Sequence, residues 1–510
     1  MDSSSQFSPY VEGIVVCIAL LSLFWIYRHT RTKVKGIPGP FKWPIIGNAL
    51  QINLRQPHLS IARIVEKYGP VVHLKVLHWD IIVLSSADAI LEATIKRGSD
   101  FAGRPDLFRA WFSTFEGQDI IFQTSTTQWA NLRKSVHRSI KSYGSNLSNI
   151  ELKLQHEAAE LVDALSDTNQ PEREFVPYDV IYRTLASVLL CLLIGQRVGK
   201  WDETLGKIEE FDHIFNECLS MGKGAELDVF PWLRYLPNKT FSRLTKACQI
   251  RNDVLFQLFK DYKKHFEEGE EDGLVGELLR QRELHLRNEQ DDVITEASII
   301  AAMGDMLVAG SDSTSTNTVC LLANLANNPA VQARVQEEID AVIGRSRPPC
   351  LSDQEAMPYV GACILESLRY ASITPLSIPH ATVTDTQVQG YSIPRGTQVW
   401  MNLWSLHHSA KTWHEPFTFN PSRFLDVHGK LVPAGHPVRH NLQAFGAGRR
   451  VCLGETLAKY EMFILTVSLL QRFTFLPGEG AAEAADPRTF MLGVILHPNP
   501  FTLVARKHAQ

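Results

Sequence analysis

The stretch that could carry chemistry most directly is a glycine-rich loop around one cysteine. It runs from Phe445 to Gly454 and reads FGAGRRVCLG, which places Gly448 and Arg450 just before Cys452. Glycine permits tight turns and lets the backbone approach a flat group closely. A cysteine thiolate can ligate a metal, and a planar guanidinium such as that of Arg450 suits carboxylates. These properties make Cys452 a candidate metal ligand beside a flat group, and the alternative is a buried structural cysteine.

A second candidate lies in a long apolar stretch, residues 295–327, which predicts one helix. A helix that is apolar on every side is expected to run through the middle of a domain. Asp312 interrupts the stretch and is followed by Ser313 and Thr314. An unpaired acid in such surroundings is costly and indicates a function. The alternative is a helix kinked by its serine and threonine side chains, without a chemical role.

The cysteine loop matches the pattern F-x-x-G-x-R-x-C-x-G, through which the chain resembles the cytochrome P-450 family in its microsomal animal form. The resemblance implies haem b, iron protoporphyrin IX, with the Cys452 thiolate as the iron ligand. Such a thiolate pushes electron density toward the iron and favours O–O cleavage. Phe445, Gly448, Arg450 and Gly454 would form the binding loop, with Arg450 paired to a haem propionate. The implied activity is that of a monooxygenase, with electrons from NADPH supplied through cytochrome P-450 reductase.

The same resemblance gives a role to the acid and hydroxyl groups of the long helix. Residues 309–314 read AGSDST, where the family has A-G-x-D/E-T-T. In the family the acid and the alcohol help to deliver protons for oxygen activation, so Asp312, Ser313 and Thr314 are the expected catalytic residues. Ser313 stands in place of a threonine and lacks the methyl group that restrains the hydroxyl rotamer.

Further motifs of the family predict contacts to the propionates. Trp129 and Arg133 match W-x-x-x-R, and His380 stands where the family places another propionate partner. For His380 the alternative is a buried histidine that serves only the core.

Glu366 and Arg369 lie three residues apart on a helix predicted over 357–370 and can pair. They match the E-x-x-R motif, which in the family forms a buried network with an arginine of a later F-x-P-x-R-F segment, here Arg423. Ser422 stands where that segment usually has an acid. We expect these residues to maintain the fold and the haem pocket, without a part in catalysis.

Segments outside these motifs suggest a substrate. Residues 228–240, 250–253, 402–408 and 413–416 closely resemble those of vertebrate steroid 17α-hydroxylase/17,20-lyase. The resemblance implies 17α-hydroxylation of progesterone or pregnenolone, with 17,20-lyase activity as a further step, in a flat apolar pocket. Shared ancestry with a changed substrate is the alternative. The expected substrate contacts are Asn216, Arg251, Asp305, Ala309 and Gly310.

The chain departs from the vertebrate steroid pattern at several positions. It is slightly shorter around Asn216, and Val308 stands in place of a glycine, which would narrow the pocket. Glu355 stands where positive charge is expected for cytochrome b5, although Arg347 remains. The lyase step is therefore less secure than hydroxylation.

Other functions stay open on the sequence. A steroid 21-hydroxylase, or an aryl-hydrocarbon or xenobiotic monooxygenase of the same family, shares this layout. A haem sensor or isomerase that needs no reductase belongs to another class, and the pair Asp312–Ser313 argues against it. A membrane scaffold without haem is a further alternative.

Net charge and cysteine spacing indicate which kinds of partner and site are not expected. The net charge is −4, from 51 basic and 55 acidic residues, which gives no indication of nucleic-acid binding. The 8 cysteines include no C-x-x-C pair, which argues against a disulfide scaffold or a zinc site and for a reducing compartment.

A basic stretch at residues 133–141 is expected to receive the acidic reductase by electrostatic steering. Cytochrome b5 is a further expected partner.

The N-terminal region predicts membrane attachment. Residues 13–27 are uncharged and largely apolar, and the basic residues Arg28, Arg31, Lys33 and Lys35 follow. A cleaved signal peptide would have its basic residues first. The pattern therefore predicts a single-pass anchor at residues 1–27 in the endoplasmic reticulum membrane, with the catalytic domain on the cytosolic side. The alternative is a buried core helix.

Two further segments complete the predicted organisation. A basic, proline-rich hinge covers 28–47, and one haem-thiolate domain covers 48–510. This domain is expected to be mainly α with a minor β region, in the cytochrome P-450 fold. The expected elements are strands at 71–77 and 81–85, helices through 150–325, the helix at 357–370, a hairpin at 387–399 and an amphipathic helix from 455.

Overall fold

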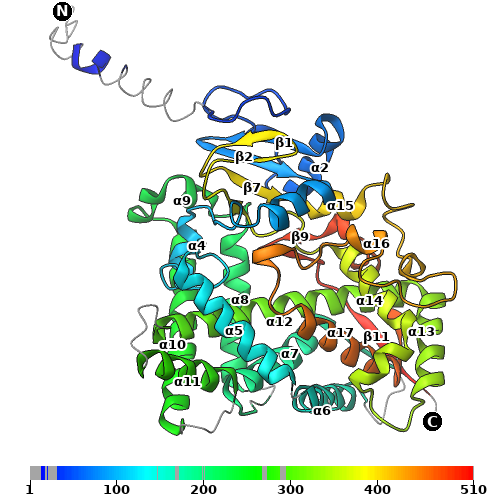
Figure 1. Cartoon of the computed structure of the whole chain (residues 1–510). Helices are drawn as coiled ribbons and strands as arrows, with labels where there is room; N and C mark the ends of the chain where they lie inside the picture. The colour runs from blue at the N-terminus through cyan, green and yellow to red at the C-terminus, as the bar shows by residue number, and fades with distance from the viewer. Residues whose placement is uncertain are drawn as a thin grey trace, which may run out of the picture.

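A computed structural model gives the fold of the whole chain (Figure 1). The structure describes residues 13–17, 20, 32–145, 147–166, 172–197, 199, 202–266, 273–287 and 294–508. Most of the predicted anchor lies outside these residues, and the part within them is helical and exposed. Among the described helices, one is long and apolar enough to cross a membrane, Pro177–Ile194, and 78% of it is buried inside the protein. That helix belongs to the core, and the anchor stays a prediction.

The longest described helix, α12 (Glu296–Asn327), crosses the middle of the molecule (Figure 1). Thr295 caps its first turn, because its hydroxyl accepts a hydrogen bond from the Ser298 amide and its own amide donates to Ser298 Oγ. Helices α7 (Pro177–Ile194), α14 (Pro358–Ala371) and α17 (Glu455–Leu470) pack around α12. The prediction of one central, mostly buried helix is confirmed.

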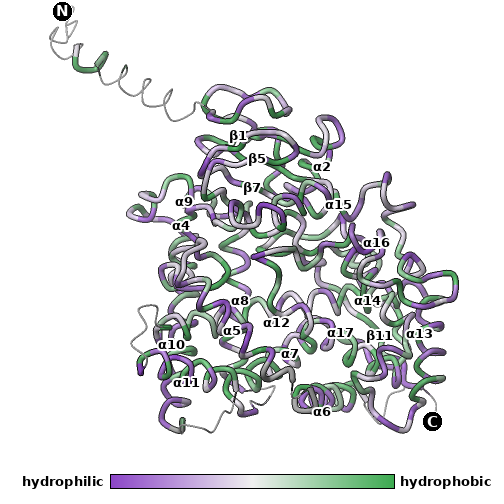
Figure 2. The backbone as a smooth tube through the Cα atoms, viewed as in Figure 1, coloured by the Kyte–Doolittle hydropathy of each residue, from purple (hydrophilic) through white to green (hydrophobic). Residues whose placement is uncertain are grey.

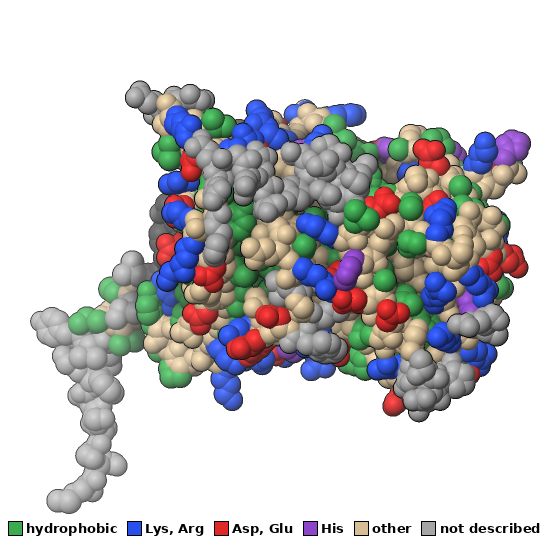
Figure 3. All heavy atoms as spheres, turned by 90° about the horizontal axis from the view of Figure 1, so that it is seen from below, with side chains coloured by type: hydrophobic (Ala, Val, Ile, Leu, Met, Phe, Trp, Pro, Cys, Tyr) green, Lys and Arg blue, Asp and Glu red, His purple; other side chains and the backbone are tan. Residues whose placement is uncertain are grey.

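The outer helices carry hydrophilic and hydrophobic residues side by side, as α10 and α13 show in Figure 2. On the face seen from below, acidic and basic side chains are interspersed (Figure 3). The remaining α-helices are α2 (Pro57–Tyr68), α3 (Ala87–Leu91), α4 (Phe108–Ser113), α5 (Thr127–Ser145), α6 (Leu147–Leu165), α8 (Glu203–Leu219), α9 (Ala225–Val229), α10 (Lys239–His265), α11 (Gly273–Arg287), α13 (Pro329–Val342), α15 (Leu403–His408), α16 (Pro437–His440) and α18 (Ala481–Ala484). Short helical turns are η1 (Ala49–Gln51), η2 (Glu92–Lys96), η3 (Pro231–Tyr235), η4 (Leu351–Ala356), η5 (Pro421–Phe424), η6 (Gly448–Arg450) and η7 (Pro487–Thr489).

The largest sheet has the strand order β1-β2-β7-β4, in which β2 and β7 are parallel and the other neighbours are antiparallel. Alternate residues of a strand point to opposite faces, and here both faces are covered, since Leu74 and Ile82 belong to different hydrophobic clusters. Smaller sheets have the orders β3-β11-β8, β10-β9 and β5-β6. The strands are β1 (Val71–Val76), β2 (Trp79–Leu84), β3 (Glu172–Phe175), β4 (His380–Ala381), β5 (Thr386–Val388), β6 (Tyr391–Ile393), β7 (Gln398–Met401), β8 (Phe473–Pro477), β9 (Met491–Leu492), β10 (Leu496–His497) and β11 (Leu503–Lys507).

Two predicted β regions need adjustment. The turn between β1 and β2 lies at residues 77–78, where Leu77 has a φ of 53°, whereas Trp79 and Asp80, which were expected to form the turn, begin β2. The predicted hairpin at 387–399 ends at Ile393, because Pro394 and Gly396 interrupt the pairing. Val399 instead belongs to β7, which joins β2 in parallel. A partner so distant in sequence leaves no local signal.

The described part of the predicted hinge, residues 32–47, lies against the β1–β2 hairpin. Thr32 Oγ1 donates to Asp80 Oδ1 (2.7 Å), and Lys42 Nζ lies 3.0 Å from His73 Nδ1. His73 Nε2 in turn lies 2.8 Å from Asp80 Oδ1. This segment is therefore fixed to the sheet by polar contacts as well as stiffened by proline.

Candidate active site

A cavity of about 390 Å³ lies between α12 and the loop that carries Cys452. Cys452 is exposed in it, and Ala309 and Asp312 of α12 also line it. The structure thus brings together two segments that are far apart in the chain and that sequence reasoning selected separately. Most of the lining is apolar and includes Ile120, Phe122, Leu189, Phe211, Ile373 and Leu457.

The backbone of the cysteine loop requires glycine at one position in particular. Gly448 begins η6 with a φ of 72°, and a Cβ atom there would overlap the carbonyl oxygen of Thr94 in η2. The loop then closes through a hydrogen bond from the Cys452 amide to the Phe445 carbonyl (2.9 Å). Gly448 therefore allows the loop to pack against a segment from the first part of the chain.

The sulfur of Cys452 faces backbone amides. Burial raises the pKa of this thiol, while the amides of Gly454 and Glu455 donate to the sulfur and lower it, as does the positive charge of Arg133. Amide donors of this kind stabilise a thiolate and tune a bound metal. The predicted ligand is thus surrounded by groups that favour its ionised form once a metal compensates for burial.

Partly buried guanidinium groups gather beside the same cavity, from Arg104, Arg133 and Arg450. Burial, together with repulsion from Arg104 and Arg133, lowers the pKa of Arg450 to about 8. The pKa of Arg104 is likewise lowered to about 10, chiefly by burial. Asp119 is the carboxyl group whose charge would raise the pKa of both Arg104 and Arg450. Burial raises the pKa of Asp119 itself, which opposes its ionisation. The cavity edge therefore carries excess positive charge that suits a ligand with carboxylates.

Arg104 was not predicted from the sequence, although it lines the cavity together with Arg450. Arg104 donates to the carbonyls of Ile121 (2.8 Å), Ile378 (2.9 Å) and Pro379 (2.9 Å). A single arginine in an irregular segment, Gly103-Arg104-Pro105, gives no periodic signal that could have identified it.

Of the two propionate partners predicted from W-x-x-x-R, Arg133 lines the cavity and Trp129 lies behind the arginines. Arg133 donates to the Val451 carbonyl, next to Cys452. Trp129 is buried, its indole N–H donates to the Ile120 carbonyl (3.0 Å), and its ring lies 3.8 Å from the Arg450 guanidinium. Trp129 therefore supports the arginines, and its direct contact with a propionate stays a prediction.

His380 lines the cavity as a neutral side chain. Its Nδ1 lies 2.8 Å from the Phe101 carbonyl, so Nδ1 carries the proton. Burial lowers its pKa to about 3, with a contribution from Arg104. The contact of His380 with a propionate stays a prediction. Because Nδ1 is bonded to the Phe101 carbonyl, Nε2 is the ring nitrogen that could make this contact.

These residues fit the haem that the resemblance implies. Cys452 would hold the iron, and Arg104, Arg133 and Arg450 would compensate the propionate charges. The negative charge of the propionates explains why these guanidinium groups outnumber the carboxyl groups beside them. When bound, a thiolate-ligated haem supplies the activation of dioxygen. The protein supplies an apolar enclosure and the polar groups of α12.

Asp312 is not the unpaired acid that we expected. Its Oδ1 accepts from Tyr178 Oη (2.6 Å) and its Oδ2 from Asn216 Nδ2 (2.9 Å), while His497 Nε2 lies 3.4 Å from Oδ2. Burial raises the pKa of Asp312, but the charge of His497 and the hydrogen bonds outweigh it and leave the pKa lowered. The inference that lack of a partner marks Asp312 for function was therefore wrong, because its partners come from α7, α8 and β10.

The two hydroxyls after Asp312 face different surroundings. Ser313 Oγ donates to the Ala309 carbonyl (2.6 Å), while Thr314 bonds to the carboxyl group of Glu461 on α17. Burial raises the pKa of Glu461 to about 8. Glu461 lines the cavity too, so the site holds a second acid that sequence reasoning missed. Its signal was an acid on the otherwise apolar face of the helix that follows Cys452.

The polar residues predicted to contact substrate are bonded to the protein itself. Asn216 donates to Asp312 and to the Asp212 carbonyl (3.2 Å). Arg251 donates to Asn252 Oδ1 and the Ser113 carbonyl, and its guanidinium lies 3.8 Å from the Phe115 ring. Asp305 accepts from the Ile120 amide (2.6 Å). All three line the cavity, but they present few free donors to a ligand.

Ala309 and Gly310 also line the cavity. A Cβ atom on Gly310 would lie 2.7 Å from Leu189 Cδ1. The small size of Gly310 therefore serves the packing of α12 against α7, and its contact with a substrate stays a prediction.

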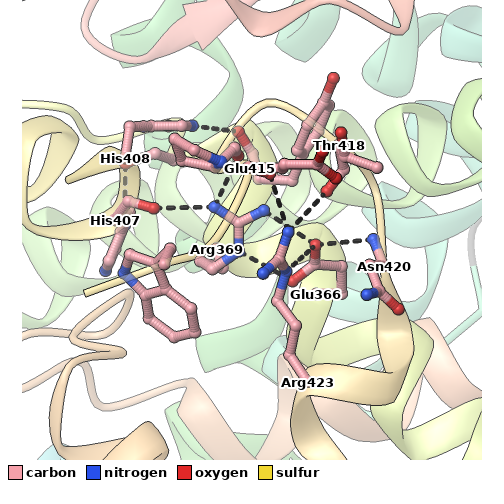
Figure 4. Close-up of polar contacts among 12 residues, drawn as sticks. Glu366, Arg369, His407, His408, Glu415, Thr418, Asn420 and Arg423 are labelled. Atoms are coloured by element: carbon pink, nitrogen blue, oxygen red, sulfur yellow. Dashed lines mark hydrogen bonds and ion pairs between the residues drawn. The ribbon is translucent and has the colours of Figure 1, made fainter. Parts of the chain in front are cut away.

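Glu366, Arg369 and Arg423 form the predicted buried network (Figure 4). Arg369 Nε and Nη2 donate to the two oxygens of Glu366, each at 2.8 Å, and Arg423 Nε lies 3.3 Å from Glu366 Oε1. Arg369 Nη1 also donates to the His407 carbonyl (2.7 Å). The His407 ring accepts from the Gln443 amide (3.1 Å), just before the cysteine loop. The network thus connects α14 to the loop that holds Cys452, and Glu366, Arg369 and Arg423 are not among the residues that line the cavity.

Comparisons with known proteins agree with this site. The cytochrome P450 family model matches residues 37–505. Cytochrome P450 1A2 of Oryctolagus cuniculus is 33% identical over 476 residues, which cover 91% of each chain. Cytochrome P450 1A1 of Homo sapiens is 32% identical over 511 residues, covering 98% of this chain and 96% of the relative. These relatives do not confirm the specific resemblance to steroid 17α-hydroxylase. The chain belongs to the cytochrome P450 family.

Proposed function

We propose that this monooxygenase inserts one oxygen atom from O2 into a flat, apolar molecule bound beside Cys452, using electrons from NADPH delivered by a reductase. The observation that carries the proposal is the mostly apolar cavity in which Asn216, Arg251 and Asp305 are already bonded to protein groups. Such a site selects a ligand by shape and apolar contact. A polar side chain could bind a ligand oxygen only after it had given up its hydrogen bond to the protein, which costs free energy. Planar aromatic molecules fit this description, which corresponds to the aryl-hydrocarbon monooxygenase that the sequence left open.

Steroid 17α-hydroxylation of progesterone or pregnenolone is the second candidate, favoured by the segments at 228–240, 250–253, 402–408 and 413–416. Several conspicuous side chains of these segments serve the scaffold. Asp228 pairs with Arg109 (2.7 Å), the Asn402 side chain caps α15, and Trp413 donates to the Leu406 carbonyl (2.9 Å). Their resemblance therefore carries less information about the substrate than about the fold.

The lyase step has less support than hydroxylation. Arg347, the remaining positive charge near Glu355, pairs with Asp353 through two bonds of 2.8 Å. This pairing reduces the positive charge available for cytochrome b5.

A reductase would dock beside the cysteine loop. Lys134, His137, Arg138 and Lys141 are exposed on α5, whose Arg133 reaches the Val451 carbonyl. These cations suit an acidic redox partner, and the same feature argues against a sensor or isomerase that needs no reductase. The proposed location remains the endoplasmic reticulum membrane, with this domain on the cytosolic side.

Spectral titration of the haem-loaded protein tests the substrate class. We expect planar polycyclic aromatics to shift the Soret band and to give oxygenated products with NADPH and reductase, identified by mass spectrometry. Progesterone and pregnenolone serve as the matched steroid arm. A steroid shift with a 17-hydroxylated product, and no response to aromatics, would contradict the aromatic assignment and establish the second candidate.

A further inference from the structure

His497, the last residue of β10, is a titratable side chain that no sequence motif identifies. Its Nε2 is shielded from solvent and points to Asp312 Oδ2, 3.4 Å away. The remaining ring is not wholly enclosed, since 25% of the side chain is exposed. His497 is also outside the set of residues that line the cavity. The ring therefore connects Asp312 with surface that lies outside the cavity.

The other partners of Asp312 cannot replace a proton that the acid gives up. An amide such as that of Asn216 does not ionise in the physiological range. Burial and the nearby charge of Asp312 raise the pKa of Tyr178 far above neutrality. Burial and the charge of Asp312 raise the pKa of Asp212, but this carboxyl group is enclosed in the protein and bonded to Tyr182. His497 alone among these partners combines partial exposure with two ring nitrogens, one of which can release a proton while the other keeps its own.

Thr316 allows His497 to change its protonation state without losing a partner. Thr316 Oγ1 lies 3.3 Å from His497 Nδ1 on the side of the ring away from Asp312. The hydroxyl oxygen can accept from a protonated Nδ1 whether or not Nε2 also carries a proton. Thr316 is buried on α12, one turn after Asp312, so it holds the ring in both states while Nε2 faces Asp312.

We propose that His497 is the residue that positions Asp312 and resupplies it with protons. In this step the N–H bond at His497 Nε2 breaks, an O–H bond forms at Asp312 Oδ2, and the ring becomes neutral with its remaining proton on Nδ1. Asp312 gives its proton to the cavity, and Nε2 regains its proton from solvent when the ring turns this nitrogen toward the exposed side of the side chain. The relay rests on the oxygenation chemistry proposed above, while the positioning of Asp312 by His497 does not.

Charged and titratable groups around the pair come from each packed element. From α7 they are Tyr178, Tyr182 and Arg183, from α8 Glu209 and Asp212, and from β10 His497 itself. Arg183 pairs with Glu209 (2.6 Å). The positive charge nearest to Asp312 in this group is thus that of His497.

Infrared pH titration of the holoenzyme tests the pair directly. The carboxyl band of Asp312 is identified as the band that Asp312→Asn abolishes. His497→Gln keeps a donor of similar reach but cannot carry the charge, so we expect the Asp312 band to persist to a pH about one to two units higher than in the parent. His428→Gln, a substitution of an exposed histidine, should leave the band unchanged.

The relay is tested by product formed per NADPH consumed, in H2O and D2O. We expect His497→Gln to lower this ratio about tenfold and to increase the solvent isotope effect. Thr316→Val, which keeps the shape of the side chain, should produce a smaller change in the same direction. The thiolate-type carbon-monoxide spectrum of each variant verifies that it has folded.

An Asp312 band that titrates identically in His497→Gln and in the parent would overturn the proposal. An unchanged ratio and isotope effect in a coupled enzyme would overturn the relay, even if the band moves. If no substrate is oxygenated at all, the proposed function fails, and the infrared titration still decides whether His497 controls Asp312.

Discussion

The sulfur of Cys452 is subject to opposing effects, since burial raises its pKa while the amides of Gly454 and Glu455 lower it. Replacing Cys452 by serine removes the soft ligand and keeps nearly the same volume. We therefore expect Cys452→Ser to lose the thiolate-type band in the reduced carbon-monoxide spectrum. Cys350→Ser, at the partly exposed N-cap of η4, is the control and should keep the band. A Cys452→Ser protein that retained the band would refute the assignment of the ligand.

Two glycines of the same loop form a matched pair. Gly446 and Gly448 have φ values of 70° and 72°, but only Gly448 lacks room for a Cβ atom, which would overlap the Thr94 carbonyl. We expect Gly446→Ala to lower the free energy of unfolding by about 1 kcal/mol, the cost of a left-handed backbone. Gly448→Ala should cost at least about 2 kcal/mol more, because the contact with η2 must open. Denaturant unfolding of both variants measures the difference, and equal losses would contradict the packing argument.

His58 on α2 gives the stability of the protein a dependence on pH. It is fully buried, neither ring nitrogen has a hydrogen-bond partner in the structure, and burial lowers its pKa from 6.5 to about 4. The unfolded chain therefore binds a proton here more readily than the folded one. The corresponding stability is present above pH 6.5 and is lost as the pH falls toward 4.

We expect His58→Phe to remove this dependence, because phenylalanine keeps the ring against Trp404 and cannot be protonated. At a pH of about 5, the loss of unfolding free energy relative to neutral pH should be about 2 kcal/mol smaller in the variant than in the parent. His428→Gln should keep the parent's dependence. Parallel curves for His58→Phe and the parent would show that His58 is not the cause.

At the scale of elements, α14 is joined to the cysteine loop by a buried charge network. Glu366 and Arg369 are fully buried, and Glu366 is the carboxylate shared by Arg369 and Arg423. Glu366→Gln leaves both guanidinium groups without their counter-charge, which costs about 3–5 kcal/mol in a buried site. Thermal unfolding should show a large decrease in midpoint, whereas Lys207→Gln, at the exposed pair with Glu203, should change it little. Similar midpoints for the two variants would contradict a structural role for the network.

The elements were predictable where the signal is local. The long apolar run of α12 and the short apolar runs of β1 and β2 can be recognised within each segment, and the E-x-x-R pair follows from helical spacing. Contacts between segments were not predictable. Asp312 looked unpaired because Tyr178 lies 134 residues away in the sequence and His497 lies on a two-residue strand. Arg104 and the parallel pairing of β7 with β2 were missed for the same reason.

The whole molecule is close to electrical balance, with a net charge of −4, so recognition of a redox partner depends on local charge. The exposed cations of α5 lie beside the cysteine loop. We expect the double substitution Lys134→Glu and Arg138→Glu to raise the KM for reductase and to weaken its dependence on salt, since rim charges act mainly on association. The substrate-induced Soret shift should not change, which separates docking from folding. Lys411→Glu, at an exposed site outside α5, is the matched control, and an equal effect there would contradict docking at α5.

The side-chain contacts of Arg450 set an order for biosynthesis. Its guanidinium donates to the carbonyls of Ala102 and Gln123, which lie 348 and 327 residues earlier in the chain. A ribosome therefore releases these acceptors long before it makes their donor, and chains fold as they emerge. The ligand loop is consequently among the last parts to be secured, and a nascent chain that stops before Arg450 contains most of the helical body but no completed site.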